Sequence, residues 1–295
     1  MIKKVENLKD ERVLYEYFKK IGSDIPCHFP VDFDSWRESM FNQKDGDAPY
    51  FTELETYLLY EKAVVKGFIQ YGLRPEWNIS AIEDKKSIAI IRNMHYDKDS
   101  KNPEPLMELA VNYANSKNAG NLQAYFFWWG MLCYGMNGTL YEPQFYIEDL
   151  LSKYSFVSHE TSVCFSKDLT NCDVCDDSEI TYIVNTPKDF VYGLHDIEID
   201  FFSGSEKTGV CSLRYFSRDI SCLIYFAIEE KYRGQGWGTR ILNKIFYILK
   251  EKNFKRFDTF TNTDNFAAQT VYTKTGFINK GLSKGNYNKY INNKR

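Results

Sequence analysis

The hydrophobic residues of this chain recur with two periods, which together predict a mixture of helices and strands. In residues 1–165, apolar side chains spaced three and four positions apart predict helices at Asp10–Ile21, Pro103–Asn115 and Pro143–Tyr154. Short runs of apolar and β-branched residues predict strands at Met1–Val5, Ser87–Met94, Asn121–Trp129 and Val157–Phe165, and a hairpin within Tyr57–Tyr71. The first half therefore has the pattern of an α/β domain.

Residues 180–295 repeat this order of elements. Ser221–Ile228 hardly alternates between apolar and polar residues, which is typical of a strand in the middle of a sheet. The acidic segment 170–179 predicts a domain boundary before it. The other predicted elements are a strand at Ile180–Val184, a hairpin of Ile197–Phe202 and Val210–Phe216 with a polar turn at 203–209, a helix at Gly238–Lys252, a strand at Phe257–Thr261, a helix at Asn265–Thr273 and a strand from Phe277.

A short sequence echo supports a duplication. Residues 149–156 and 270–277 both lead from a helix end into a strand, offset by 121 positions. The echo pairs Leu151 with Tyr272, Lys153 with Lys274, Ser155 with Gly276 and Phe156 with Phe277. Because the order of elements is also repeated, we expect a duplicated fold.

Composition excludes several classes of protein. With 43% hydrophobic and 26% charged residues, the chain has enough apolar surface for packed cores, which excludes a disordered, collagen-like or coiled-coil protein. It has no run of 18 apolar residues, and its first twelve residues carry charges of both signs. We therefore expect a soluble, cytoplasmic protein whose seven cysteines, which lack framework spacing, are reduced.

The charge is unevenly distributed. Residues 231–295 hold fourteen Lys and Arg against three acidic residues, whereas residues 1–230 have a net charge of −14. This asymmetry fits either a solvated basic face or a C-terminal segment that contacts an anion.

A glycine-rich segment between a predicted strand and a predicted helix is the most informative motif. It consists of Arg233, Gly234, Gln235, Gly236, Trp237, Gly238 and Thr239. Alternate glycines allow the backbone to approach a ligand closely, and the start of the following helix offers free N–H groups, so the segment predicts a phosphate site.

Two common phosphate motifs do not fit this segment. A dinucleotide fingerprint that begins at Gly234 requires a third glycine where Thr239 stands, although Asp258 lies where a ribose-binding acid is expected. Only 57 residues follow Gly238, too few to complete a dinucleotide-binding domain, and the Walker pattern is absent.

The stretch from Ala227 to Phe277 resembles the acetyl-CoA-binding core of the GCN5-related N-acetyltransferases (GNAT). Arg233, Gly236 and Gly238 match the family's R-x-x-G-x-G motif. Downstream, the family pattern N-x-x-A-x-x-x-Y-x-x-x-G-F is matched by Asn265, Ala268, Tyr272, Gly276 and Phe277. The resemblance covers residues 180–295.

The resemblance implies an α/β fold of two GNAT-like domains, each a mixed, mainly antiparallel twisted sheet flanked by helices. Residues 1–165 match the family only in the order of their elements, and residues 95–105 contain no glycine where a first phosphate loop is expected. We therefore expect a degenerate GNAT-like domain without a phosphate loop at 1–169 and an acetyl-CoA-binding catalytic domain at 170–295.

The resemblance also implies a reaction and its site. It implies transfer of an acetyl group from acetyl-CoA to a primary amine by direct attack, with Tyr272 as the general acid that protonates the thiolate. Amides of residues 234–239 would hold the pyrophosphate, and Ala227 and Ile228 would face the pantetheine arm. Asn265 would orient that arm or, alternatively, only cap a helix.

The general base and the acceptor are less well defined. Residues 221–226 hold no strong base, so Glu229 is the predicted base. The alternatives are Glu198, Asp200, a water chain, or an amine that arrives already neutral. The acceptor is expected to be a small-molecule or peptide amine, such as a polyamine, an aminoglycoside, an amino acid or a peptide N-terminus. Neither a nucleic acid nor a membrane is expected as a partner. The alternative function is a CoA-binding regulatory or interaction protein whose catalytic groups have decayed.

Other residues with reactive side chains predict no further site. Cys172 and Cys175 lack a second pair of ligands, and neither His159 nor His195 has metal-ligand spacing to them, so no metal site is expected. The aromatic run Tyr125–Trp129 is expected to pack on both sides of a strand.

Overall fold

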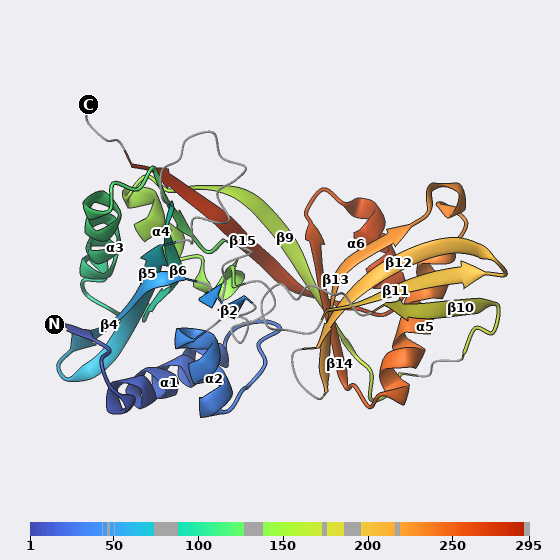
Figure 1. Cartoon of the computed structure of the whole chain (residues 1–295), viewed down its shortest axis with the longest axis horizontal. Coiled ribbons are helices and arrows are strands. Elements are labelled where there is room, and N and C mark those ends of the chain that lie inside the picture. Colours follow the sequence, from blue (N-terminus) through green and yellow to red (C-terminus); the bar gives the residue numbers. More distant parts are fainter. Residues whose placement is uncertain are drawn as a thin grey trace. The chain divides into compact units, whose positions relative to one another are not determined.

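The computed structural model describes residues 1–42, 44–45, 48–49, 51–73, 88–126, 138–172, 176–185, 196–215 and 219–291. The chain forms two compact units (Figure 1), Met1–Thr161 with Ser283–Arg295 (unit 1) and Ser162–Leu282 (unit 2). Two strands, β9 (Val157–Asp168) and β15 (Ile278–Tyr290), contribute residues to both units. The predicted boundary at 170–179 follows β9, whereas the division between the units falls within β9.

Unit 1 is a sheet with the strand order β1-β4-β5-β6-β7-β15, in which β8 also pairs with β15. Among the strand pairs described in unit 1, β6 and β7 are the parallel pair. Its elements are β1 (Ile2–Lys4), α1 (Leu8–Gly22), α2 (Phe33–Phe41), β4 (Thr52–Glu61), β5 (Val64–Leu73), β6 (Ile88–Tyr96), α3 (Glu104–Ser116), β7 (Asn121–Ala124), β8 (Leu140–Tyr141), the 3-10 helix η2 (Glu142–Gln144), α4 (Ile147–Lys153) and the small hairpin β2 (Lys44–Asp45) and β3 (Ala48–Pro49).

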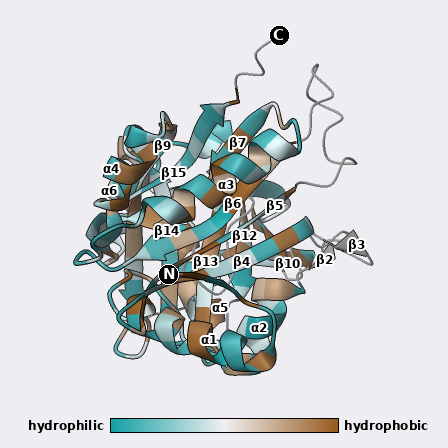
Figure 2. Cartoon of the chain, turned by 90° about the vertical axis from the view of Figure 1, so that its left-hand side faces the viewer, coloured by the Kyte–Doolittle hydropathy of each residue, from teal (hydrophilic) through white to brown (hydrophobic). Residues whose placement is uncertain are grey.

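Helices cover both faces of this sheet because neighbouring strand residues point to opposite faces. On one face, Ile69 of β5 belongs to the same hydrophobic core as Leu106 of α3. On the other face, the ring of the adjacent Phe68 lies 6.2 Å from the Tyr17 ring of α1. Hydrophobic residues follow inner strands such as β6, while the helices present hydrophilic residues to solvent (Figure 2).

Unit 2 has the strand order β9-β14-β13-β12-β11-β10. In the described part of unit 2, β13 and β14 are the parallel pair, and the central position predicted for β13 is confirmed. Its elements are β10 (Ile180–Asn185), β11 (Asp196–Ser203), β12 (Glu206–Tyr215), β13 (Ile220–Ile228), the 3-10 helix η3 (Glu230–Tyr232), α5 (Trp237–Glu251), β14 (Arg256–Asn262) and α6 (Phe266–Lys274).

The core of unit 2 forms between α5 and one face of the sheet. Ile241, Ile245 and Leu249 recur at helical spacing along α5 and are fully buried. They belong to the same core as Leu213 of β12 and Phe257 of β14. The α/β class and the mainly antiparallel sheets with flanking helices are therefore confirmed.

Several local predictions differ from the structure. The helix expected at Pro143–Tyr154 is divided into η2 and α4, and α2 was not predicted. The strand expected at Asn121–Trp129 ends at Ala124, because Tyr125 has the left-handed φ of 50°; residues 127–129 lie outside the described part. The turn expected at 203–209 contains only Gly204 and Ser205 between β11 and β12.

Among the described helices, none is both long and apolar enough to cross a membrane.

Candidate active site

The two parallel strands of unit 2 separate partway along their length. The parallel pairing of β13 with β14 extends from Ile220 and Arg256 to Leu223 and Thr259, and β13 then continues without it to Ile228. We call the space between these strands beyond Leu223 and Thr259 the unit 2 fork. On the side that faces away from β12, residues 224–228 have no ladder with β14. The backbone groups that point there, except the Ile228 carbonyl that accepts a hydrogen bond from Arg233, are therefore open to an extended ligand.

A β-bulge occurs where the strands separate. Leu213 of β12 pairs with Leu223 and Ser212 pairs with Tyr225, so Ile224 is the extra residue. A bulge bends its strand and increases the local twist, which accounts for the departure of β13 from β14 at this point. Burial changes at the same residue, since positions 220–223 are buried whereas the Tyr225 side chain is 55% exposed.

The glycine loop connects β13 to α5. Gly234 and Gly236 have φ values of 74° and 84°, which residues with a Cβ rarely adopt. A Cβ at either position would have no neighbour within 4 Å, so the backbone here faces open space. Gly236 is the N-cap of α5 and has no side-chain hydrogen bond, so the first N–H groups of the helix lack a side-chain cap. This loop can therefore hold an anion with its backbone.

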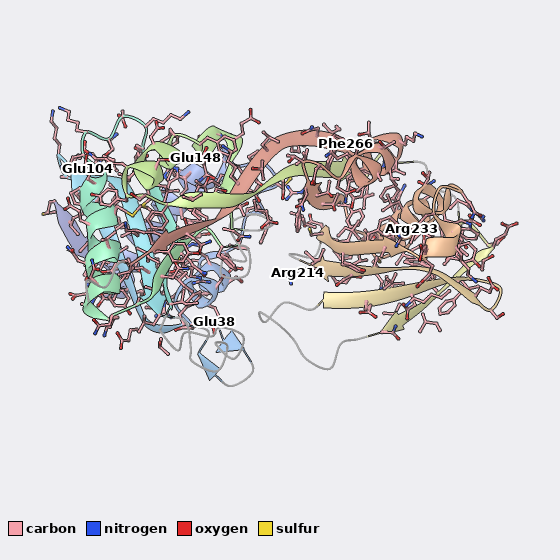
Figure 3. The ribbon with its side chains drawn as sticks, turned by 90° about the horizontal axis from the view of Figure 1, so that it is seen from above. Glu38, Glu104, Glu148, Arg214, Arg233 and Phe266 are labelled. Carbon is pink, nitrogen blue, oxygen red and sulfur yellow. The ribbon has the colours of Figure 1, made fainter. Side chains whose placement is uncertain are left out.

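The cations near the loop differ in their partners. Lys231 is 2.7 Å from Glu206, and Arg240 pairs with Asp177 and Glu179. Within the described residues Arg233 forms no ion pair, and its Nε donates a 3.0 Å hydrogen bond to the Ile228 carbonyl. Figure 3 labels Arg233 beside the start of α5. Arg233 is thus the cation of the loop whose charge is not balanced by a neighbouring carboxylate.

The other loop residues predicted to contact the cofactor have structural contacts of their own. The Gln235 side chain donates a 2.7 Å hydrogen bond to the Lys231 carbonyl. The Trp237 ring packs under the Arg240 guanidinium at 4.5 Å from its centroid. Gly238 and Thr239 are the second and third residues of α5, so their N–H groups are in its first turn.

Tyr272 lies next to the closed end of the fork. Its side chain is 5% exposed and packs at 5.5 Å from the rings of Phe165 and Phe277. Burial raises the pKa of Tyr272, and a hydrogen bond with Thr259 partly opposes this shift. Because Thr259 belongs to the last parallel pair of β13 and β14, the Tyr272 hydroxyl lies where the two strands part.

The end of α6 is held by a lysine that sequence reasoning did not single out. Lys167 of β9 is buried, and its Nζ donates a 2.8 Å hydrogen bond to the Thr275 carbonyl at the C-terminus of α6. Gly276 follows with a φ of 82°, and a Cβ there would lie 2.8 Å from the Lys167 Nζ. The lysine and the glycine together fix where α6 ends, and so fix Tyr272 one turn earlier. No sequence pattern connects Lys167 to α6, because the contact spans 108 residues.

Asn265, Glu229 and Asp258 have distinct positions. Asn265 is the N-cap of α6, and its side-chain oxygen accepts a 3.2 Å hydrogen bond from the Ala268 amide. Glu229 is exposed beyond the end of β13 and lines a surface hollow with Glu206 and Lys207.

Asp258 is fully buried in β14, where it accepts a 2.6 Å hydrogen bond from Ser166, and burial raises the pKa of Asp258. It is therefore placed within the sheet and not at the glycine loop.

No group of three or more His, Cys, Asp or Glu residues within the described ranges could hold a metal ion. Cys175 and His195 lie outside those ranges.

Comparisons with known proteins give one family match and several similar folds. Residues 179–277 match the model of the acetyltransferase (GNAT) family. A tandem GNAT protein from the clavulanic acid biosynthesis pathway is similar in structure, with a TM-score of 0.65 and 12% identity over 98% of this chain and 98% of that chain. A GCN5-related N-acetyltransferase from Sphaerobacter thermophilus is similar with a TM-score of 0.62 and 8% identity, over 98% and 95% of the two chains.

A third similar structure is a GCN5-related glucosamine N-acetyltransferase region of a fungal multi-domain β-N-acetylglucosaminidase. Its TM-score is 0.62 at 11% identity, and the match covers 97% of this chain and 38% of that one. A search of curated protein sequences finds no significant match. Residues 179–277 of this chain therefore match the acetyltransferase (GNAT) family, and the whole fold is similar to that of a tandem GNAT protein.

Proposed function

We propose that unit 2 transfers an acetyl group from acetyl-CoA to a primary amine of a small molecule or peptide. The observation that carries this proposal is the joint position of three features around one fork. The glycine loop lies at its open end, the part of β13 beyond the ladder with β14 (residues 224–228) runs along one side, and Tyr272 lies at its closed end. Together they provide an anion site, a slot for an extended chain and a proton donor.

The residues present fit acetyl-CoA. When bound, it supplies an acetyl group activated as a thioester. The amides that follow Gly234 and Gly236 are in open space and would hold its pyrophosphate, with Arg233 as the nearest cation without a carboxylate partner among the described residues. Ala227 and Ile228 would pair their backbone groups with the pantetheine arm, and an amide of this strand would stabilise negative charge on the acetyl oxygen.

Tyr272 is proposed as the general acid. A tyrosine whose pKa is raised by burial keeps its proton at neutral pH, so it is able to donate that proton to a departing thiolate. Asn265 is proposed to act on the cofactor only indirectly, through the start of α6 that it caps. Glu229 stays the proposed base. Its exposed position beyond the end of β13 favours proton transfer through water over direct contact with the amine.

A second function, the binding of coenzyme A without turnover, is supported by the lack of a strong base on the part of β13 beside the fork. Residues 224–228 are Ile, Tyr, Phe, Ala and Ile, none of which is a strong base at neutral pH. A protein that binds coenzyme A without turnover would have the same cradle and the same fork. Turnover separates these two functions.

The experiment is an assay of thiol release from acetyl-CoA with a panel of polyamines, aminoglycosides, amino acids and peptides. With an accepted amine, Tyr272→Phe should lower kcat by roughly tenfold or more while the affinity for acetyl-CoA stays within about twofold of the wild type. Tyr182→Phe is the matched control, because this exposed tyrosine lies on the edge strand β10. An unchanged kcat in Tyr272→Phe would refute the role of Tyr272, and binding without turnover across the panel would favour the second function.

A further inference from the structure

Unit 1 contains the same fork as unit 2. The parallel pairing of β6 with β7 also has four residue pairs and ends at Ile91 and Ala124. A bulge follows at once, since Tyr71 pairs with Ile91 and Gln70 with Asn93, which makes Arg92 the extra residue. Strand β6 then continues to Tyr96, five residues beyond the last pair, just as β13 continues five residues beyond Leu223. Each residue of β6 therefore corresponds to the residue 132 positions later in β13.

The helices that follow the two forks also end in the same way. Ser155 after α4 and Gly276 after α6 have φ values of 64° and 82°. The next amides donate equivalent hydrogen bonds of 3.0 Å, from Phe156 to the Leu151 carbonyl and from Phe277 to the Tyr272 carbonyl. By this correspondence, the residue of unit 1 that takes the place of Tyr272 is Leu151, which has no proton to donate.

The strand carbonyls along the fork of unit 1 already have partners. The Tyr125 hydroxyl donates to the Met94 carbonyl, and the Tyr146 hydroxyl donates to the Tyr96 carbonyl. The corresponding carbonyls of unit 2 are those of Phe226 and Ile228. No described side chain donates to the Phe226 carbonyl, and Arg233 of the glycine loop donates to that of Ile228.

A buried histidine contacts one of these two tyrosines, Tyr146, together with Tyr17 of α1. His95 lies with its Nε2 3.1 Å from the Tyr146 hydroxyl and its Nδ1 3.0 Å from the Tyr17 hydroxyl. Its side chain is 7% exposed, and it occupies the position of Ala227 in unit 2. A bulky, hydrogen-bonded side chain therefore replaces a methyl group beside the fork.

The segment that replaces the glycine loop, residues 97–103, contains no glycine. Between β6 and α3, Asp97 lies 3.0 Å from Lys20 and Asp99 lies 2.9 Å from Lys66. Without a glycine, the backbone of this segment cannot approach a phosphate as closely as the loop of unit 2, and Pro103 at the N-cap position of α3 has no N–H to offer.

We infer that the fork of unit 1 is a second cofactor slot that the chain has closed with its own tyrosine hydroxyls, so that each chain binds one molecule of acetyl-CoA. The hydroxyls of Tyr125 and Tyr146 donate hydrogen bonds to the strand carbonyls with which an extended ligand would have to pair. The count of one rests on the proposed function of unit 2, whereas the closure of unit 1 does not.

The first test is calorimetric titration of CoA into the full chain and into Gly236→Glu. We expect one site per wild-type chain and no site in Gly236→Glu, because a carboxylate would then project into the phosphate cradle of unit 2. Two sites in the wild type, or one site that survives in Gly236→Glu, would overturn the closure of unit 1. No site in the wild type would instead refute the proposed function.

The second test does not depend on CoA. Hydrogen–deuterium exchange of residues 92–97 is compared in Tyr125→Phe, Tyr146→Phe and the control Tyr290→Phe, a tyrosine of unit 1 that is 77% exposed. The closure predicts that exchange in this segment rises at least about tenfold in the first two variants, because buried carbonyls lose their donors. Exchange equal to that of the control would show that the hydroxyls do not hold the strand and would overturn the inference.

Discussion

Replacement of Gly236 by alanine separates backbone strain from cofactor binding, because the chain offers a matched glycine. Gly236 at a φ of 84° and Gly204 in the β11–β12 turn at 60° both require a left-handed backbone, and a Cβ at either would meet nothing within 4 Å. An alanine in this conformation costs about 1–2 kcal/mol. We therefore expect Gly236→Ala and Gly204→Ala to lower the free energy of unfolding by similar amounts.

Their effects on acetyl-CoA should differ. The Cβ that Gly236→Ala adds enters open space at the N-cap of α5, whose first amides are the proposed phosphate site, whereas Gly204 is in the turn between β11 and β12. We expect the Kd for acetyl-CoA to rise at least about tenfold, or 1.4 kcal/mol, in Gly236→Ala and to stay unchanged in Gly204→Ala. Urea unfolding and calorimetry measure the two quantities. Equal affinities in both variants would refute the assignment of this loop as the phosphate cradle.

Three further predictions concern individual side chains. Asn265→Ala should destabilise unit 2 by about 1 kcal/mol in urea unfolding, because α6 loses its side-chain cap. Burial lowers the pKa of His95 to about 4 from an ordinary 6.5. As the pH falls, His95 is therefore protonated in the unfolded chain before it is protonated in the folded one. The free energy of unfolding should therefore keep its full value above pH 6.5 and be lower by about 2 kcal/mol at pH 5. This loss should be absent in His95→Asn. Lys167→Met should lower kcat more than acetyl-CoA affinity, because it frees the end of α6 that positions Tyr272.

Most elements were predictable from the chain because their signals are local. The spacing of Ile241, Ile245 and Leu249 predicts α5, and the uncharged run of β13 predicts a central strand. The helix α2 escaped prediction because it is short and buries only Trp36 and Met40. Its position depends on distant contacts, since Arg92 of β6 donates to the Met40 and Ser39 carbonyls at its end.

The duplication was visible in the echo between residues 149–156 and 270–277, which pairs Leu151 with Tyr272. The separation of the strands in unit 2 was expected only from the family resemblance, and the fork of unit 1 was not expected. Each fork results from a bulge opposite a neighbouring strand, so its position depends on the register between strands and not on one short segment. The closure of the first fork likewise depends on tyrosines far along the chain from the carbonyls that they bind. The roles of Glu229 and Tyr272 stay predictions, which the thiol-release assay addresses.

The central claim is that acetyl-CoA binds in the fork of β13 and β14, and hydrogen–deuterium exchange with and without acetyl-CoA tests it most directly. The account predicts that bound acetyl-CoA slows exchange at residues 224–228 and at the amides of 234–239, and leaves residues 92–97 unchanged. Protection of residues 92–97, or no protection in either segment of unit 2 at a saturating concentration, would contradict it.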